Sequence, residues 1–444
     1  MTLEASSTLI RAPFFHTPVN PFTSAAALVS QEDGGLLISQ GLIVASGHYR
    51  DVRAQAPADA HVLDWRGGIV LPGLVDAHVH YPQLRIIGGL GRTLLDWLEH
   101  VALPEEARMA DVGLARSTAS AFVHALLSHG TTAAMVFGAH FGPATACLFE
   151  AAAEGGLRMA SGLVLSDRGL RPELLQSPRD AHATATDLIG RFHGRGRLLY
   201  AVTPRFALSA SEAMLEVCQS LASEHEGLRV QTHINEQPDE IAEVRRLYPW
   251  AKDYLEVYER YALSGPRAVM AHNVHPSDAE LERMASARTA VAHCPCSNAA
   301  LGSGIFPLRR HVAAGVPCAL GTDIGGGTGF GILKEGLQAY LMQRVFAEGM
   351  ALTPVHLLYL ATRAGAEAMG LSAETGDLRP GRAADLVYIK PPSNGPLAAV
   401  LDRATGTDDV LAAIVTLAGA ESVAEVRVQG DVVYRRAEYP QEGA

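Results

Sequence analysis

The stretch Pro72-Gly73-Leu74-Val75-Asp76-Ala77-His78-Val79-His80 decides the fold, because it is an apolar run that ends in polar residues. It opens a middle region, residues 69–379, in which apolar strands alternate with amphipathic helical patterns. The eight expected strands are Ile69–His80, Thr131–Phe137, Arg158–Leu165, Leu198–Pro204, Leu228–His233, Ala268–His272, Thr289–His293 and Pro317–Asp323. Eight strand–helix units in succession predict a parallel (β/α)8 TIM barrel of the α/β class.

The two ends of the chain differ from this middle region. Residues 1–68 contain short β segments separated by Gly, Pro and Asp turns, and residues 380–444 return to the same pattern. Near the C-terminus, Gly430-Asp431 lies between two apolar β segments, which indicates a hairpin. We therefore predict two domains. One is a small composite β-sandwich domain from residues 1–68 and 380–444, and the other is the barrel domain, residues 69–379.

Composition and charge exclude several classes of partner. The chain has 36 Lys and Arg against 47 Asp and Glu, a formal net charge of −11, and no basic run. Phosphate contacts need clustered Lys and Arg, so no nucleic acid partner is expected. A membrane span needs about 20 consecutive apolar residues, and the longest apolar stretch near the C-terminus, Val410–Ala420, is shorter. No membrane partner is therefore expected.

The N-terminus and the cysteines bear on localisation. The opening sequence MTLEASSTLIRAPFF has no basic segment before an apolar core, so it does not resemble a signal peptide. The five cysteines are an odd number in a large chain, which fits reduced thiols better than a disulfide framework. Together these features predict a cytoplasmic protein.

Ligand-type side chains recur where the expected strands end. The active site of a (β/α)8 barrel lies at the carboxyl ends of its strands. His78 and His80 are two residues apart on one strand, so they point to the same face. Alone the pair could be ordinary polar residues, but His233, His272 and Asp323 end other strands of the same barrel. Five such residues at one rim predict a metal site and make the barrel the metal-dependent catalytic domain.

The donor types and the scarcity of lysine narrow this metal site. Imidazole and carboxylate ligands without thiolate suit Zn²⁺, and iron also fits. Barrel hydrolases with two metals commonly bridge them with a modified lysine after the fourth strand, but the first lysine here is Lys252. We therefore predict one ion per subunit, bound by a four-residue set: His78, His80, His233 and Asp323. His272 is expected opposite, where it orients the hydroxide that the metal generates.

Glu236 lies three residues beyond His233, past the end of the strand. A carboxylate there can reach both the activated water and the substrate. This position suits a proton shuttle that takes a proton from water and delivers it to a ring nitrogen. Without the surrounding site, the same residue would be interpreted as a solvated loop glutamate. Asp323 is expected to act both as a ligand and as a hydrogen-bond acceptor from the hydroxide.

Several motifs together resemble a known family. The stretch from Pro72 to His80 resembles the first-strand motif of the amidohydrolase superfamily, and Gly381–Val387 resembles its C-terminal β-sandwich motif. Further matches, over essentially the whole chain, are to the guanine deaminase family: His80–Gln83, Leu94–Leu98, Thr203–Phe206, Thr232–Glu236, His293–Pro295 and Gly321–Gly327. The resemblance implies zinc-dependent hydrolysis of a small-molecule purine base, guanine, to xanthine and ammonia in purine catabolism or salvage. It also implies a homodimer.

The resemblance also implies substrate contacts. In that family the Gln and Arg at the positions of Gln83 and Arg205 contact the purine. The Arg fork suits the O6 and N7 acceptors of guanine, and the Gln amide offers a donor and an acceptor to the O6/N1–H edge. Phe206 could pack on the ring. The set expected to contact substrate is completed by His233, Glu236, His272 and Asp323. Arg205 could instead form a structural salt bridge, and Gln83 could cap a loop.

The expected reaction has a defined order of steps. Glu236 protonates N3 while hydroxide attacks C2, His272 and Asp323 hold the hydroxide and the tetrahedral intermediate, and Glu236 then helps to protonate the departing amine. Another base of the same class, such as cytosine, an ammeline-type triazine or an oxidised guanine, is an alternative substrate. A metal-free scaffold protein is the alternative from another class.

Two further features remain open at this level. Cys294 and Cys296 form a Cys-x-Cys pair, but the resemblance implies that these thiols are not ligands. The long segment Tyr81–Asp111 after the first barrel strand is a candidate lid or interface. Trp97, within that segment, could wall the pocket or belong to the core.

Overall fold

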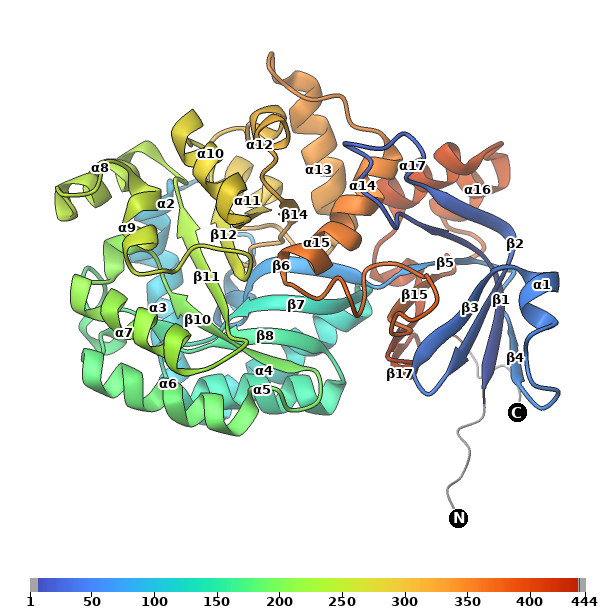
Figure 1. Ribbon diagram of the computed structural model, residues 1–444, viewed down its shortest axis with the longest axis horizontal. Helices are drawn as coiled ribbons and strands as arrows, with labels where there is room; N and C mark the ends of the chain where they lie inside the picture. The colour runs from blue at the N-terminus through green and yellow to red at the C-terminus, as the bar shows by residue number, and fades with distance from the viewer. Residues whose placement is uncertain (1–6, 438, 440–444) are drawn as a thin grey trace.

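The computed structural model describes residues 7–437 and 439, and its larger part is a barrel of parallel strands (Figure 1). Neighbouring strands run in the order β14-β13-β12-β11-β10-β8-β7-β6, and every neighbouring pair is parallel. The strands are β6 (Leu74–His80), β7 (Thr131–Phe137), β8 (Arg158–Gly162), β10 (Leu198–Pro204), β11 (Arg229–Ile234), β12 (Ala268–His272), β13 (Ala290–His293) and β14 (Cys318–Leu320), with the short β9 (Val164–Leu165) paired to β10. The predicted (β/α)8 barrel is confirmed.

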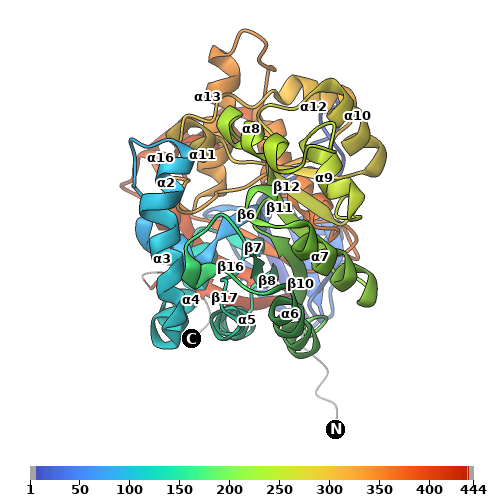
Figure 2. The ribbon, with the colours of Figure 1, turned by 90° about the vertical axis from the view of Figure 1, so that its left-hand side faces the viewer.

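Helices surround the strands of the barrel, as Figure 2 shows in a view from the side opposite the small domain. Parallel strands covered in this way are buried on both sides, and every residue of β6 and β7 is buried. The helices between strands begin with α4 (Val112–Ser128), α5 (Gly142–Gly155), α6 (Pro178–Phe192), α7 (Glu212–Glu224), α8 (Pro238–Leu247) and α9 (Tyr254–Arg260). They continue with α10 (Asp278–Ala287), α11 (Pro295–Ala300), α12 (Leu308–Ala314), α13 (Ile332–Val345), α14 (Pro354–Ala361) and α15 (Arg363–Ala368).

Hydrogen bonds at the rim link the residues that follow the last barrel strand, β14, to the first barrel strand, β6. The amide of Asp323 donates to the carbonyl of His78 at 2.9 Å, and the amide of Thr322 donates to the buried Asp76 carboxylate at 3.0 Å. Gly321 lies so close that an added Cβ would stand 2.8 Å from the Cβ of His78. This close approach brings the residues that follow β14 beside the end of β6.

Both ends of the chain form a separate sheet (Figure 1, right). Its order is β17-β16-β15-β5-β1-β2-β3, with β4 paired to β1. The strands are β1 (Thr8–His16), β2 (Val29–Ser39), β3 (Leu42–His48), β4 (His61–Asp64), β5 (Ile69–Pro72), β15 (Leu386–Ile389), β16 (Val423–Val428) and β17 (Asp431–Arg435). Trp65 from the N-terminal part stacks on Tyr388 from the C-terminal part, with ring centroids 4.4 Å apart.

The strand expected over Ile69–His80 is two strands that belong to different sheets. The break falls at Gly73, whose amide donates to the carbonyl of Asp385 at 2.9 Å. An added Cβ at Gly73 would stand 2.0 Å from the hydroxyl oxygen of Thr132. The chain therefore passes from the small sheet, where β5 pairs with β1 and β15, into the barrel at a point where only glycine fits.

The terminal regions also contain helices that their β-like sequence did not indicate. These are α1 (Tyr49–Arg53), α16 (Pro396–Arg403) and α17 (Thr407–Leu417). Much of the apolar stretch Val410–Ala420 lies in α17, whose buried residues include Leu411 and Ile414. Residues 1–6, 438 and 440–444 belong to the predicted composite domain but lie outside the described residues.

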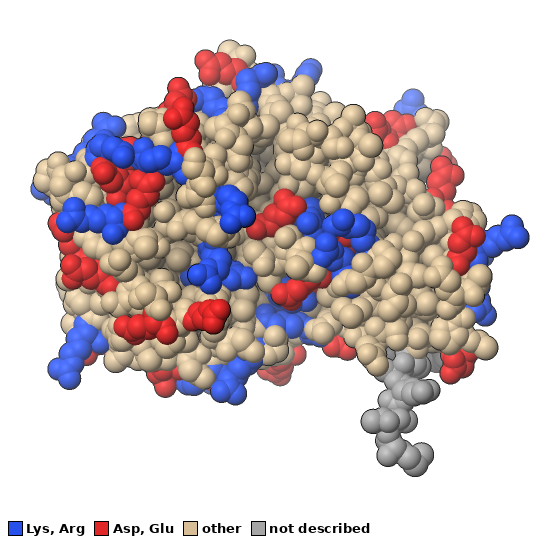
Figure 3. Space-filling view, viewed as in Figure 1, with Lys and Arg blue, Asp and Glu red and all other residues tan. Residues whose placement is uncertain are grey.

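Two surface properties bear on partners. Within the described part of the chain, no helix has both the length and the apolar character needed to cross a bilayer. Figure 3 shows Lys and Arg interspersed with Asp and Glu on the face that it presents, and a mixed surface of this kind does not favour phosphate backbones.

Candidate active site

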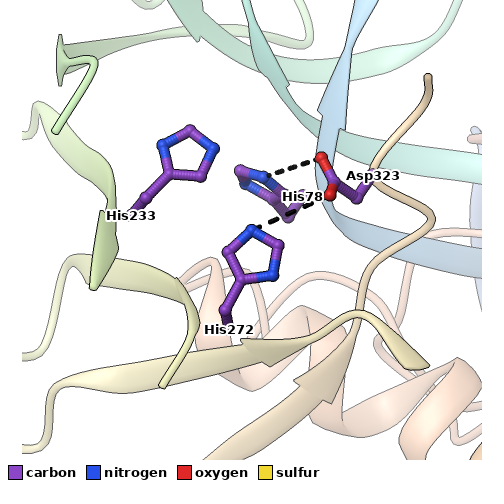
Figure 4. A group of neighbouring side chains, drawn as sticks. All are labelled: His78, His233, His272 and Asp323. Atoms are coloured by element: carbon purple, nitrogen blue, oxygen red, sulfur yellow. Dashed lines mark ion pairs between the residues drawn. The ribbon is translucent and has the colours of Figure 1, made fainter. Parts of the chain in front are cut away.

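The ligand-type residues predicted from strand ends meet at one rim of the barrel. His78 and His80 end β6, His233 lies near the end of β11, and His272 ends β12. Asp323 follows β14. Ligand atoms of His78, His233, His272 and Asp323 all lie within 4.8 Å of one another, and the four side chains point to a common centre (Figure 4).

His80 joins this cluster by its own contacts. Its Nε2 lies 3.2 Å from Nε2 of His78 and 3.2 Å from Nε2 of His233. Oδ1 of Asp323 lies 3.3 Å from Nε2 of both His78 and His80. The four residues predicted as ligands are thus linked by short contacts, while His272 approaches Asp323 through the other oxygen, Oδ2, at 3.8 Å.

The cluster fits a bound cation. Burial lowers the pKa of His80 to about 3 and holds the pKa of His233 well below its ordinary value, so their imidazoles are neutral. Nδ1 of His233 faces the backbone carbonyl of Arg205 at 2.6 Å, so it bears the proton and Nε2 presents a lone pair. Nitrogens bound to one zinc at roughly 2.0–2.1 Å stand about 3.3 Å apart at a tetrahedral angle. The spacing of 3.2 Å between the Nε2 atoms of these histidines matches that arrangement.

Asp323 and Glu236 are two buried carboxyl groups with opposite behaviour. Burial disfavours the charge on Asp323, but hydrogen bonds with His78 and His80 outweigh it and hold the pKa of Asp323 well below its usual range. Glu236 accepts one hydrogen bond, from Oγ of Ser303 at 3.0 Å, and its Oε2 lies 3.5 Å from Nε2 of His272. Burial raises the pKa of Glu236 to about 7. A carboxyl group with that pKa can accept and release a proton at neutral pH.

A contact with Asn298 holds His272 in place beside Glu236 and Asp323. Its Nδ1 lies 2.9 Å from Oδ1 of Asn298, so Nδ1 donates and Nε2 faces the site. The carboxylates of Glu236 and Asp323 outweigh the effect of burial and raise the pKa of His272. Sequence reasoning gave no role to either supporting residue, Asn298 or Ser303, because both lie several residues beyond the end of β13.

A small pocket opens beside the cluster. Its polar wall includes Gln83, Arg205 and Glu236, and its apolar wall is formed by Leu94, Trp97, Leu98, Phe206 and Leu301. The predicted substrate residues therefore line a single cavity together with three of the four predicted ligands, His80, His233 and Asp323.

The segment Tyr81–Asp111 forms one wall of that pocket. It contains the short helices α2 (Leu94–Trp97) and α3 (Leu103–Ala107), joined by a π-helical turn over Leu98–Ala102. Trp97 is buried, lines the pocket and packs in a small apolar cluster with Phe206. Both interpretations of Trp97, as pocket wall and as core, are therefore correct.

Glu106 on α3 is a site residue that the sequence did not indicate. Its Oε1 accepts a hydrogen bond from Nε2 of Gln83 at 2.7 Å and lies 3.0 Å from a guanidinium nitrogen of Arg205. The amide of Gly325 donates to Oε1 of Gln83 at 2.8 Å. The alternatives of a salt bridge for Arg205 and a capping amide for Gln83 are thus both present, and both side chains still line the pocket.

Cys294 and Cys296 follow β13 but take no part in the cluster. Among the residues that the structure describes, the clustered ligand atoms come from histidine and aspartate. Burial raises the pKa of the Cys294 thiol well above its ordinary value, so it is not a thiolate. All five cysteines are unpaired.

Comparison with known proteins agrees with this geometry. Residues 69–433 match the amidohydrolase family. The chain belongs to this family. Within it, the chain is similar to guanine deaminases: it is 53% identical over 433 residues to the probable guanine deaminase of Deinococcus radiodurans, covering 96% of this chain and 99% of that relative.

Solved structures place the chain beside the same group of enzymes. The guanine deaminase of E. coli superposes with a TM-score of 0.92 at 36% identity, covering 97% of this chain and 100% of that one. The guanine deaminase of C. acetobutylicum, determined with guanine bound in the active site, superposes with a TM-score of 0.89 at 25% identity over 97% and 100% of the two chains.

Proposed function

We propose that this protein hydrolyses guanine to xanthine and ammonia, as a step of purine catabolism or salvage. The observation that supports this most directly is a single pocket lined by two sets of residues. The catalytic candidates are Glu236, His272 and Asp323, and the purine-contact candidates are Gln83 and Arg205. The names of the similar enzymes, one of which was determined with guanine in its active site, agree with this proposal.

The donor set supports one metal ion per subunit, which we propose to be zinc. His78, His80, His233 and Asp323 would hold it, and iron would accept the same donors. When bound, the ion acts as a Lewis acid that makes water a nucleophile at neutral pH. The scarcity of lysine agrees with a single ion, because the lysines of this chain are Lys252, Lys334 and Lys390, and none of them lines the pocket.

Glu236 moves the protons of the reaction. It takes one proton from the attacking water and delivers it to N3 of guanine, which makes C2 more electrophilic. After attack at C2, it transfers the second proton of that water to the departing amine, so that guanine and water become xanthine and ammonia. A pKa of about 7 lets the same carboxyl group serve as base and as acid.

His272 and Asp323 orient the attacking oxygen. Nε2 of His272 faces the oxygens of both Glu236 and Asp323, at 3.5 and 3.8 Å, so a water between them has a donor and acceptors at fixed positions. The ionised Asp323 accepts a hydrogen bond from that water and holds it toward the ring. Gln83, Arg205 and Phe206 bind the base so that C2 faces this oxygen.

The substrate assignment is tested by measuring ammonia release from guanine, other aminopurines, cytosine, ammeline and oxidised guanine by the purified, metal-loaded enzyme. Guanine is expected to have the highest kcat/KM. A higher value for cytosine or a triazine would move the assignment to that base. Metal analysis after gentle purification is expected to find about one zinc per chain. A chain that neither holds metal nor releases ammonia from any base would instead support the scaffold alternative.

We also propose that the protein is a cytoplasmic homodimer. Five unpaired cysteines agree with a reducing compartment, and the dimer rests on the resemblance to its family alone. Light scattering at micromolar concentration tests the oligomeric state, and a monomeric mass would contradict the dimer.

A further inference from the structure

The carboxylate of Glu106 is buried between the two residues that are proposed to contact the base. We propose that Glu106 is a positioning residue that sets the specificity of the pocket for a neutral base, by fixing the Gln83 amide and neutralising the charge of Arg205. This inference rests on the proposed deamination of guanine and deepens it, because it explains how the substrate is separated from ligands of similar shape and different charge.

The first part of the argument concerns the orientation of Gln83. Its Nε2 donates to Oε1 of Glu106 at 2.7 Å, and its Oε1 accepts from the amide of Gly325 at 2.8 Å. Turning the amide over would place oxygen against the carboxylate and NH2 against an amide N–H. One N–H and one lone pair therefore remain for a ligand. Glu106 therefore fixes the side of the pocket on which the NH2 group of Gln83 lies.

The second part concerns the charge of Arg205. One guanidinium nitrogen, Nη1, lies 3.0 Å from Oε1 and 3.2 Å from Oε2 of Glu106, and both side chains are buried. The remaining N–H groups of the guanidinium stay available to a ligand. Because the pair has no net charge, this end of the pocket can donate hydrogen bonds to ring carbonyl and nitrogen acceptors without favouring an anion.

The third part concerns the neighbours of this pair. Nδ1 of His140 lies 3.5 Å from Oε2 of Glu106, and burial holds the pKa of His140 well below its ordinary value, so this imidazole adds no charge. Removing the charge of Glu106 would therefore leave Arg205 as an unbalanced cation beside the ligand. Xanthine loses a ring proton more readily than guanine, so an unbalanced cation would favour the product anion over the substrate.

Glu106 could instead be a structural ion pair that only fastens α3 to the barrel. The two roles predict different results. A structural role changes stability and alters all ligands alike. The proposed role changes the ratio between an anionic and a neutral ligand, which a loss of stability does not move.

The test compares three variants of the metal-loaded enzyme. In Glu106→Gln the amide oxygen can still accept from Gln83 and from Arg205 in the place of Oε1. The NH2 group replaces Oε2, faces His140 and gives up the bond that Arg205 makes there at 3.2 Å, so the charge and that one bond are lost. Glu106→Asp keeps the charge and withdraws the oxygens by one methylene. The matched control is Glu105→Gln, because Glu105 is the neighbouring residue on α3 and pairs instead with Arg85 and Arg108 at 3.5 and 3.4 Å.

The measured quantities are KM and kcat for guanine and the inhibition constant of xanthine, on both sides of neutral pH. In Glu106→Gln, xanthine should bind about tenfold more tightly relative to guanine, and the effect should grow as pH rises. Glu106→Asp should raise KM about tenfold, because its acceptors no longer reach Gln83 and Arg205, and leave the ratio at the wild-type value. Glu105→Gln should change neither the KM for guanine nor the xanthine-to-guanine ratio.

Two outcomes separate this inference from the proposed function. If the wild-type enzyme deaminates guanine and Glu106→Gln leaves the xanthine-to-guanine ratio unchanged, the inference is wrong and the function stands. If the wild-type enzyme neither binds nor deaminates guanine, both are wrong. Should Glu106→Gln fail to fold, Glu106→Asp still decides the positioning role, since an unchanged KM would contradict it.

Discussion

Replacing Glu236 by glutamine tests the proton-transfer step most directly. The amide is nearly isosteric with the carboxyl group, and its oxygen can still accept the hydrogen bond from Ser303 that Oε1 accepts at 3.0 Å. The proposed ligands do not include Glu236, so the metal should remain bound. What is lost is the carboxyl group that is proposed to take a proton from water and pass it to the ring.

The expected size of the effect follows from that loss. A positioned proton donor or acceptor contributes roughly 10²–10⁴ in rate, which corresponds to about 2.7–5.4 kcal/mol in the activation free energy. Two separate transfers, to N3 and to the leaving amine, depend on this one group in the proposed mechanism. We therefore expect kcat for guanine in Glu236→Gln to fall by at least about 10², with KM changed by a smaller factor.

The assay is steady-state xanthine formation by enzyme whose metal content has been measured. Glu335→Gln is the control, because Glu335, on α13, is also a buried carboxyl group. It lies outside the pocket and accepts a hydrogen bond from the amide of Cys296 at 3.0 Å. Burial raises the pKa of Glu335 to about 8, so the neutral amide resembles its native form. If Glu236→Gln retains turnover within about tenfold of the wild type at equal metal content, Glu236 is not the proton shuttle.

Three further predictions follow from the same contacts. Arg205→Ala should raise KM for guanine by about 10–100-fold, because a charge-assisted hydrogen bond to the base is lost and Glu106 is left buried and unpaired; an unchanged KM would exclude Arg205 from binding. Chelation should abolish ammonia release and lower Tm, and added zinc should restore both, whereas full activity in metal-free enzyme would contradict the proposed site. Burial lowers the pKa of His16 from about 6.5 in the unfolded chain to about 4. Between these two pH values the unfolded state binds more protons, so the free energy of unfolding of the wild type should fall by up to about 3 kcal/mol as the pH falls. His16→Asn should not show this loss. This prediction is tested by measuring urea unfolding midpoints of both proteins across that pH range. Equal pH dependence in the wild type and in His16→Asn would contradict it.

The site was predictable where the chain forms regular structure. Each of His78, His80, His233 and His272 ends an apolar run that is recognisable as a buried strand, and a parallel barrel gathers all such ends at one rim. Once the barrel was predicted, the spacing of two residues between His78 and His80 already placed them on one face. The prediction depended on the fold and needed no knowledge of individual side-chain contacts.

Prediction from the sequence failed where contacts join segments without such a period. Glu106 lies on a helix of five residues, and its partners are 23 and 99 residues away in the chain. No pattern within the segment Tyr81–Asp111 indicates that one of its acidic residues points inward. Gly73 is a related case, because the apolar residues on both sides of it continue the pattern of a single strand, and the requirement for glycine comes from Thr132 on a neighbouring strand.

Asp323 and Glu236 line the same pocket, but their different contacts suit them to different roles. Asp323 lies 3.3 Å from two imidazole nitrogens, and those contacts favour its charged form in spite of burial. Glu236 has one hydroxyl donor and a single imidazole at 3.5 Å, so burial dominates and its pKa rises to about 7. A carboxylate that stays ionised is suited to hold a cation, and one that titrates near neutral pH is suited to carry a proton. Exchanging the two residue types should therefore not exchange the roles, because the surrounding nitrogens and the depth of burial, more than the length of the side chain, separate the two pKa values.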